Sequence, residues 1–266
     1  MLTPIARYAR LLVVQLKLSA LLSLQYRADF FSDAATSVFW LFFNIAPLLA
    51  AFHYRGAIAG WTFPQALVVL GFFTLLKGVM DGAINPSLAA IVDQIRKGTL
   101  DYALLKPVDS QFLLSTARFE PWKTADVLGG AALVVVALTR LGRIPRLQDM
   151  TVSALLLLTA VAILYSLWIC TVCAAFYVVR LDNLAFLFSS IFDLARWPIG
   201  VFRGMLRLFF TFVIPLALMT TYPAMALLGA LSVRNALLAV LGTGLFFGLA
   251  RLLWSRAILH YASASS

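Results

Sequence analysis

Charge is scarce in this sequence. Asp, Glu, Lys and Arg make up only 12% of the 266 residues, against about 25% in a soluble domain. Hydrophobic residues make up 62%, and several uninterrupted apolar runs reach the length of about 20 residues that a transmembrane helix needs. These runs do not alternate apolar and polar residues, as the strands of a membrane β-barrel do. The sequence therefore predicts an all-α, polytopic membrane protein.

Cysteine and catalytic motifs are scarce too. The two cysteines, Cys170 and Cys173, lie inside an uncharged run (150–179). No His or third thiol lies near them in sequence, so packing against a neighbouring helix is favoured over a zinc or redox site. The sequence contains no GxxxxGK[ST] phosphate loop, no HExxH and no GxSxG. We expect no catalytic residue, cofactor or metal on this chain, and an energy source on another chain.

Basic residues, by contrast, are in excess, with a net charge of +10. They flank the apolar runs, as the cytoplasmic loops of membrane proteins require, so nucleic acid is not expected as a partner. Residues 5–28 predict an amphipathic helix lying in the membrane interface, because Arg7, Arg10 and Lys17 share one side of a helical wheel. Lipid is therefore an expected partner.

Six membrane spans are predicted from the apolar runs. Five follow directly from the sequence: 34–52, 64–84, 124–140, 151–178 and 235–254. The sixth has two alternatives. Either 184–202 crosses and 203–230 forms external half-helices that dip into the membrane, or 184–203 lies on the cytoplasmic surface and 204–222 crosses. The distribution of Lys and Arg favours the second. Both place the two termini and the loop 85–123 in the cytoplasm.

Lys77 and Asp81 are a candidate intramembrane polar pair. They lie four residues apart near the end of the span 64–84, so they can pair on one helix face. Ionisable groups inside a membrane often mark functional sites, although snorkelling of both side chains to the interface is the favoured interpretation. Other polar candidates within or beside the spans are Ser37, Asn44, Asp126, Ser189, Ser190, Asp193 and Arg196.

The loop 85–123 is the longest polar connection. Asn85-Pro86 predicts a helix start, with Asn85 as N-cap. Leu88, Ile91, Val92 and Ile95 then recur at helical spacing and form an apolar stripe, and Gly98 predicts the helix end. A second short helix is expected near 109–118, capped by Asp109 or Ser110. An amphipathic helix outside the bilayer, on a chain without its own energy source, indicates a docking element.

The segment "RKGTLDYALLKPVDSQFLLSTARF" resembles the signature segment of ABC-2 type exporter permeases. The stretches "KLSALLSLQYRADFFSDAATSVFWLFF", "WTFPQALVVLGFF" and "FVIPLALMTTYPAMALLGA" resemble one bacterial branch of that family. The resemblance implies a single transmembrane domain over 1–266, an N-terminal interfacial helix, a cytoplasmic coupling helix and re-entrant external helices before the last span. It therefore selects the arrangement in which 184–202 crosses.

The resemblance also implies a function. It implies the permease subunit of an ATP-driven exporter in the plasma (inner) membrane, paired with a second permease, identical or homologous, and with two ABC ATPase subunits that bind ATP and Mg²⁺. A non-transporting scaffold subunit and an ion-coupled transporter are the alternatives. Carried over onto this sequence, the residues implied in ATPase coupling are Ile91, Ile95, Arg96, Lys97, Gly98, Thr99, Leu100, Asp101, Leu104, Leu105, Lys106, Pro107 and Val108.

Overall fold

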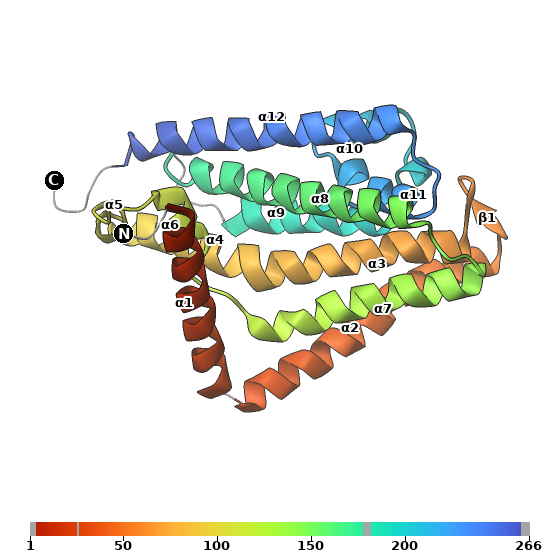
Figure 1. Cartoon of the computed structure of the whole chain (residues 1–266), viewed down its shortest axis with the longest axis horizontal. Coiled ribbons are helices and arrows are strands. Elements are labelled where there is room, and N and C mark those ends of the chain that lie inside the picture. The colour runs from red at the N-terminus through yellow and green to blue at the C-terminus, as the bar shows by residue number, and fades with distance from the viewer. Residues whose placement is uncertain (1–3, 26, 178–181, 262–266) are drawn as a thin grey trace.

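The computed structural model describes residues 4–25, 27–177 and 182–261. Four long helices run along the longest axis of the molecule (Figure 1): α3 (Phe63–Val79), α7 (Thr124–Leu141), α8 (Leu147–Ala174) and α12 (Val233–Ile258). Helix α2 (Arg27–His53) converges with α7 at one end and splays away from the bundle at the other, and α1 (Pro4–Gln25) lies across that second end. The prediction of an all-α, multi-span chain is confirmed.

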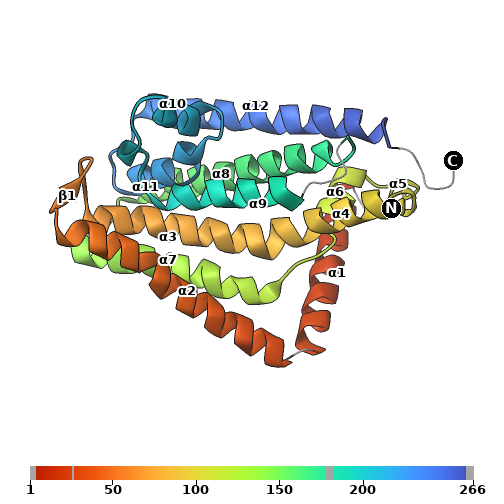
Figure 2. The ribbon, with the colours of Figure 1, turned by 180° about the vertical axis from the view of Figure 1, so that it is seen from behind.

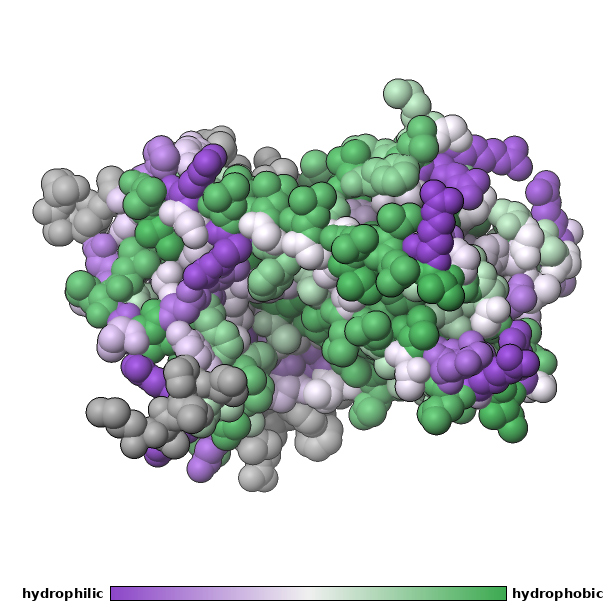
Figure 3. Space-filling view, turned by 45° about the horizontal axis from the view of Figure 1, so that its top comes forward, coloured by the Kyte–Doolittle hydropathy of each residue, from purple (hydrophilic) through white to green (hydrophobic). Residues whose placement is uncertain are grey.

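The two ends of the bundle differ in what caps them. A hairpin of two short strands, β1 (Ala57–Ile58) and β2 (Trp61–Thr62), lies at one end, called here the β1 end. At the other, the α4 end, lie α4 (Asn85–Lys97), α5 (Asp101–Leu104) and α6 (Ser110–Ser115). Figure 3 shows hydrophobic residues over the middle of one face and hydrophilic residues gathered toward both ends, the distribution that a membrane-spanning bundle requires.

Five helical stretches are long and apolar enough to cross a membrane: 35–53, 63–97, 121–141, 147–174 and 233–258. A sixth is counted if the pair Gly204–Phe212 and Ala217–Leu227, bent by 69°, forms one span. The five expected spans thus fall on observed helices. Residue 178, the expected end of the fourth, lies outside the described residues, as does residue 26 within the expected interfacial helix.

The expected break at Asn85 is wrong, because the helix continues from Phe63 to Lys97. A π-helical turn, η1 (Met80–Ile84), joins α3 to α4, and Asn85 has helical φ and ψ of −54° and −48°. Asn85 is therefore no N-cap. Pro86 cannot donate to the carbonyl four residues earlier, Gly82, and its ring would clash there in a regular helix. The wider turn accommodates the ring, and the Glu120 N–H donates to that carbonyl instead, at 2.8 Å.

Glycines let α3 and α7 pack unusually closely. A Cβ at Gly130 would lie 2.5 Å from the backbone N of Leu75 and 2.6 Å from the O of Gly71. Small residues at a helix interface allow such backbone contact, which is the common packing mode inside membranes. In the most apolar 18-residue window of each stretch, 67% of the residues are buried in 63–97 but only 11% in 35–53. The first is the central helix of the bundle, and the second is its most exposed candidate span.

The segment 184–202, predicted as a membrane span, is not one continuous helix. Instead α9 (Asp182–Phe192) is followed by one 3₁₀ turn, η3 (Asp193–Arg196), and an extended Trp197. Pro198 explains the break, because a residue before proline is pushed out of helical geometry. Even so, α9 lies parallel to α3 and α8 in both views (Figure 2). The chain then reaches the β1 end, where a Cβ on Gly200 would lie 3.4 Å from the O of Ala59.

The remaining short helices stay near the β1 end. They are η4 (Ile199–Val201), α10 (Gly204–Phe212), the π-turn η5 (Ala217–Thr221) and α11 (Tyr222–Leu227). The hydroxyl of Thr220 donates to the carbonyl of Ala195 at 2.8 Å, and the Ile199 N–H donates to the hydroxyl of Thr221 at 3.1 Å. These bonds fasten the bent pair to the break after α9.

Candidate functional site

Helix α4 carries the first part of the predicted docking element. Leu88 and Ile91 are buried in the core and Val92 and Ile95 pack against it, so the apolar stripe faces the protein's own bundle. The helix ends at Gly98, as predicted, because this residue adopts the left-handed φ of 67°. Two bonds close the end: Gly98 N–H to the carbonyl of Ile95 at 3.2 Å, and Thr99 N–H to that of Gln94 at 3.0 Å.

Helix α6 is capped by Asp109, one of the two predicted caps. Its carboxylate accepts a hydrogen bond from the Phe112 N–H at 2.9 Å. Helix α6 spans Ser110–Ser115, which is shorter than the predicted 109–118. The hydroxyl of Ser87 on α4 donates to the carbonyl of Arg118 at 2.7 Å and accepts from its N–H at 3.0 Å. The loop after α6 is thereby tied back to the helix before it.

A polar hub joins α6 to two membrane helices. We use this name for Asp109, Gln111, Ser115, Tyr165 and Arg251. Arg251 of α12 donates from both guanidinium nitrogens to the Asp109 carboxylate and, at 2.8 Å, to the side-chain oxygen of Gln111. Gln111 donates to the Tyr165 hydroxyl of α8 at 3.0 Å, and Ser115 lies 2.8 Å from the same hydroxyl. Such a satisfied network fixes the relative position of its helices.

Electrostatics favour the ionised form of Asp109. Partial burial alone would raise the pKa of this carboxyl, but the hydrogen bonds from Arg251 and from the Phe112 N–H, together with the Arg251 charge, outweigh it. The pKa therefore lies below its ordinary value. The bidentate contact between Arg251 and Asp109 is consequently present at neutral pH.

Helix α1 is fastened along the same segment. Five hydrogen bonds join its side chains to residues about 100 positions away. Arg7 donates to the Pro107 carbonyl at 3.1 Å and Gln15 to the Leu113 carbonyl at 3.2 Å. In the other direction, the Asp109 N–H donates to Tyr8 at 3.2 Å, the Thr116 hydroxyl to Gln15 at 2.7 Å and the Phe119 N–H to Ser19 at 3.1 Å. No local pattern in the sequence predicted these contacts, because each joins residues that are far apart along the chain.

The predicted coupling residues differ in their exposure to solvent. Ile91 and Leu100 are fully buried and hold the segment in place, and Ile95, Gly98, Asp101, Leu104 and Val108 are partly buried. Tyr102, which was not among the predicted residues, is 75% exposed and lies one helical turn before Leu105, which is 81% exposed. The outward residues, named here the coupling face, are Arg96, Lys97, Thr99, Tyr102, Leu105, Lys106 and Pro107.

The chain matches a known protein family. A family model described as ABC-2 family transporter protein matches residues 38–265, which is most of the chain. The chain belongs to the ABC-2 transporter family. It is a multi-pass membrane protein of a family whose membrane subunits typically lack catalytic activity. No curated protein and no solved structure matches it significantly.

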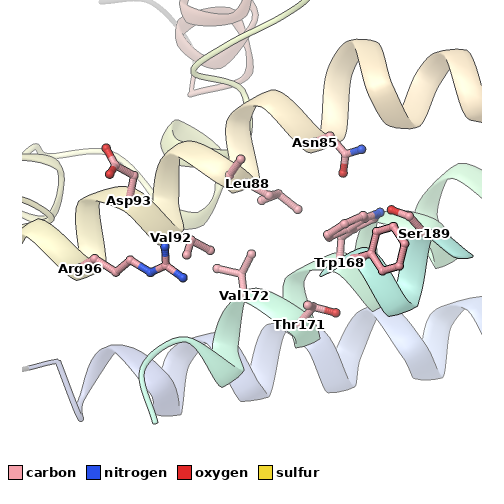
Figure 4. Close-up of a pocket in the computed structure, with 11 residues that line it drawn as sticks. Asn85, Leu88, Val92, Asp93, Arg96, Trp168, Thr171, Val172 and Ser189 are labelled. Carbon is pink, nitrogen blue, oxygen red and sulfur yellow. The ribbon is translucent and has the colours of Figure 1, made fainter. Parts of the chain in front are cut away.

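One cavity of this ABC-2 protein lies beneath α4 (Figure 4). Its volume is about 360 Å³, and α4, α8 and α9 form its walls. Leu88 and Val92 lie across from Trp168 and Val172 in that view. The Trp168 indole N–H is buried and has no hydrogen-bond partner among the described residues. Ser189 lines this cavity, whereas Ser190 is exposed and donates to the Phe186 carbonyl at 2.9 Å.

A second cavity of about 510 Å³, called here the charged cavity, lies between α2, α3, α7 and η3. Its charged residues are Lys77, Asp81, Lys123, Asp126, Asp193 and Arg196, and Ser37 and Asn44 also line it. The structure therefore brings together polar candidates that are widely separated in sequence. The predicted pair lies 3.6 Å apart between Lys77 Nζ and an Asp81 carboxylate oxygen. Lys77 also lies 3.8 Å from Asp193, a contact that sequence spacing did not predict.

Proposed function

We propose that this ABC-2 protein is the permease subunit of an ATP-driven exporter, coupled through the coupling face to separate cytoplasmic ATPase subunits. Two permeases and two ATPases would form the complex, with ATP and Mg²⁺ held by the ATPases. The α4 end and both termini would then lie in the cytoplasm of a cell whose plasma membrane the helices span. The observation that carries the proposal is an outward face on a segment bonded to four helices, α1, α4, α8 and α12.

Mechanical transmission is the physical basis of this proposal. Helix α4 continues α3 without a break, and the polar hub connects α6 to α8 and α12. A push on the coupling face would therefore move three membrane helices as a rigid body. ATP would bias the permease only if the ATPase contacts differ between its inward and outward states.

Substitution on the coupling face tests the proposal. The tagged full chain, isolated from native membranes, should carry ATPase activity and the mass of two permeases plus two nucleotide-binding subunits. Leu105→Arg should lower the co-purified ATPase activity about tenfold, the loss expected from about 1.4 kcal/mol at an interface. Ile144→Arg is the matched control, since Ile144 is exposed on the loop after α7. Equal effects of both substitutions would contradict the assignment.

Ion-coupled transport is the second candidate, because charged side chains gather between the membrane helices. The two mechanisms differ in their energy source. Transport by purified chain in vesicles, driven by a proton gradient without ATP, would favour the ion-coupled mechanism and count against the first proposal.

A further inference from the structure

The charged cavity is electrically balanced. Three cationic side chains, Lys77, Lys123 and Arg196, face three anionic ones, Asp81, Asp126 and Asp193. Isolated charges in a membrane protein are costly unless they pair or contact water, so balance alone is expected of any stable cavity. What distinguishes this one is how incompletely the charges satisfy one another.

The ion pairs in the charged cavity are all loose. The shortest nitrogen–oxygen distances are 3.6 Å for Lys77–Asp81 and Lys123–Asp126, and 3.8 Å for the pairs that Asp193 makes with Lys77 and Arg196. Direct hydrogen bonds between such groups fall at about 2.7–3.2 Å. Among the described residues, neither lysine ammonium makes a hydrogen bond of that length. Asp81 does accept a hydrogen bond from Asn85 at 2.7 Å, and Arg196 donates to the Asp193 carbonyl at 2.7 Å. The groups that a ligand can still engage are therefore the two lysine ammoniums and the carboxylates of Asp126 and Asp193.

Ser37 supplies a second, independent indication of a ligand. Its side chain lines the cavity and is only 5% exposed, and its hydroxyl has no hydrogen-bond partner among the described residues. A buried hydroxyl without a partner is unfavourable. The opposite arrangement occurs nearby, where Asn44 accepts a bond from Arg196 at 3.0 Å. A polar ligand group would supply the partner that Ser37 lacks.

Aromatic side chains form the outer wall. Trp40 and Phe43 of α2 line the cavity, and their rings meet edge to face with centroids 5.4 Å apart. The same two side chains are 52% and 56% exposed on the outside of α2. The wall is thus one side chain thick, and it separates the charges from the apolar surroundings of α2. Aromatic faces bind quaternary ammonium groups through cation–π attraction.

We propose that the charged cavity binds the zwitterionic, phosphocholine-like headgroup of an amphiphile that enters sideways past α2. The quaternary ammonium lies against Trp40 and Phe43 near the carboxylates. The phosphate lies among Lys77, Lys123 and Arg196, and the hydrocarbon chain leaves along the exposed apolar face of α2. The amphiphile is the cargo of the permease, a role that rests on the function proposed above.

Three probes of equal chain length test this proposal: dodecylphosphocholine, dodecyl sulfate and dodecyltrimethylammonium. Each is titrated below its micellar concentration against the full chain in phosphatidylglycerol nanodiscs, whose host lipid is not zwitterionic, and binding is measured by thermophoresis. We expect dodecylphosphocholine to bind at least about fivefold more tightly than either singly charged probe. Equal affinities, or tightest binding of a singly charged probe, would overturn the proposal.

Variants of one ion pair sharpen the test. Arg196→Gln leaves a net negative cavity and should shift the preference toward dodecyltrimethylammonium, whereas Asp193→Asn should shift it toward dodecyl sulfate. Arg256→Gln on α12 and Asp93→Asn on α4 are matched controls, because both side chains are exposed and neither lines the charged cavity. The preference is the ratio of two probe affinities measured on the same sample. Partial misfolding lowers both affinities together, so it does not produce opposite shifts in the two variants. Unchanged preferences in both cavity variants would refute the site.

A second copy of the chain is the competing occupant of the exposed α2 face. In that case Trp40→Ala would change the mass of the purified assembly and leave the preference among the probes unchanged, which would also overturn the proposal. The binding assay contains no ATPase. Its failure would therefore leave ATPase coupling untouched, and loss of the ATPase would leave probe binding intact.

Discussion

The polar hub and the charged cavity lie on the same protein but are built in opposite ways. In the hub, neutral and charged groups meet at hydrogen-bond distance, as in the 2.8 Å contact of Arg251 with Gln111. In the cavity, opposite charges stop at 3.6–3.8 Å. The first arrangement fixes helices relative to one another. The second leaves bonding capacity unused, which suits a place where a ligand comes and goes.

The largest expected effect comes from disrupting the packing of α7 on α3. Helix α7 begins beside the charged cavity, with Lys123 just before it and Asp126 in its first turn. It packs on α3, whose continuation α4 is bonded through Ser87 to the loop after α6. Gly130→Leu forces a side chain into the Leu75 backbone, only 2.5 Å from the new Cβ. We expect a loss of about 3 kcal/mol or more in the free energy of unfolding, measured by thermal denaturation and by the yield of folded protein in detergent.

Gly244→Leu is the control for that substitution, because nothing lies within 4 Å of a Cβ at Gly244 on α12. It should leave the melting temperature within a few degrees of the wild type. If the two leucine variants were equally stable, close α3–α7 packing would not hold the clusters in place.

Removal of one hub partner comes next in size. Arg251→Ala takes away the bidentate contact with Asp109 and the bond to Gln111. Because Arg251 is about half exposed, we expect only about 1–2 kcal/mol of lost stability, together with weaker stimulation of ATPase activity by cargo. Arg256→Ala, one turn further along α12 and also exposed, should change neither the stability nor the stimulation.

Acid should weaken the hub through Asp109. Its pKa is lower in the folded state than the ordinary value of about 3.9, so its stabilising contribution is complete above that value and is lost as pH falls through the folded pKa. The advantage of the wild type over Asp109→Asn in melting temperature should therefore be present at pH 7 and vanish in acid. An advantage that persisted there would show that charge is not what stabilises the hub.

Glu120 should show the opposite dependence of stability on pH. Burial is the main cause of its raised pKa, so its ionised form is unfavourable in the folded state. Glu120→Gln should therefore be more stable than the wild type at pH 7, and the difference should close as pH falls below about 4.3.

Local signals made the end of α4 and one residue of the hub predictable. Gly98 was predicted to end α4 because a left-handed residue after two basic residues is typical of a helix C-terminus, and Asp109 was a predicted cap for the same kind of reason. The pair Asn85-Pro86 led to a wrong prediction because it is compatible with two structures. It can start a new helix, or it can follow a π-turn inside a continuous one. The Gly82 carbonyl accepts its hydrogen bond from the Glu120 N–H, 38 positions further along the chain, so the residues around Asn85 alone do not reveal the π-turn.

Long-range partners explain what the sequence did not predict. Arg251 and Asp109 are 142 positions apart, and Asn44 and Arg196 are 152 apart. No periodicity connects such residues, because periodicity reports only which face of one helix a residue occupies. Polar residues within apolar runs were therefore identifiable as candidates, but their gathering into one cavity depends on how α2, α3, α7 and η3 pack.

The smallest expected effect is a change in the free energy of unfolding that has opposite signs when two buried serines are each replaced by alanine. Ser19 on α1 and Ser37 on α2 are both buried, but Ser19 accepts a bond from the Phe119 N–H at 3.1 Å, whereas Ser37 has no partner among the described residues. Ser19→Ala should cost about 1 kcal/mol, since it leaves a backbone N–H unpaired. Ser37→Ala should be neutral or gain up to about 1 kcal/mol, because it removes an unsatisfied hydroxyl. Parallel thermal denaturation of the two variants measures this difference, and a comparable loss in Ser37→Ala would mean that the charged cavity is as fully bonded as the hub.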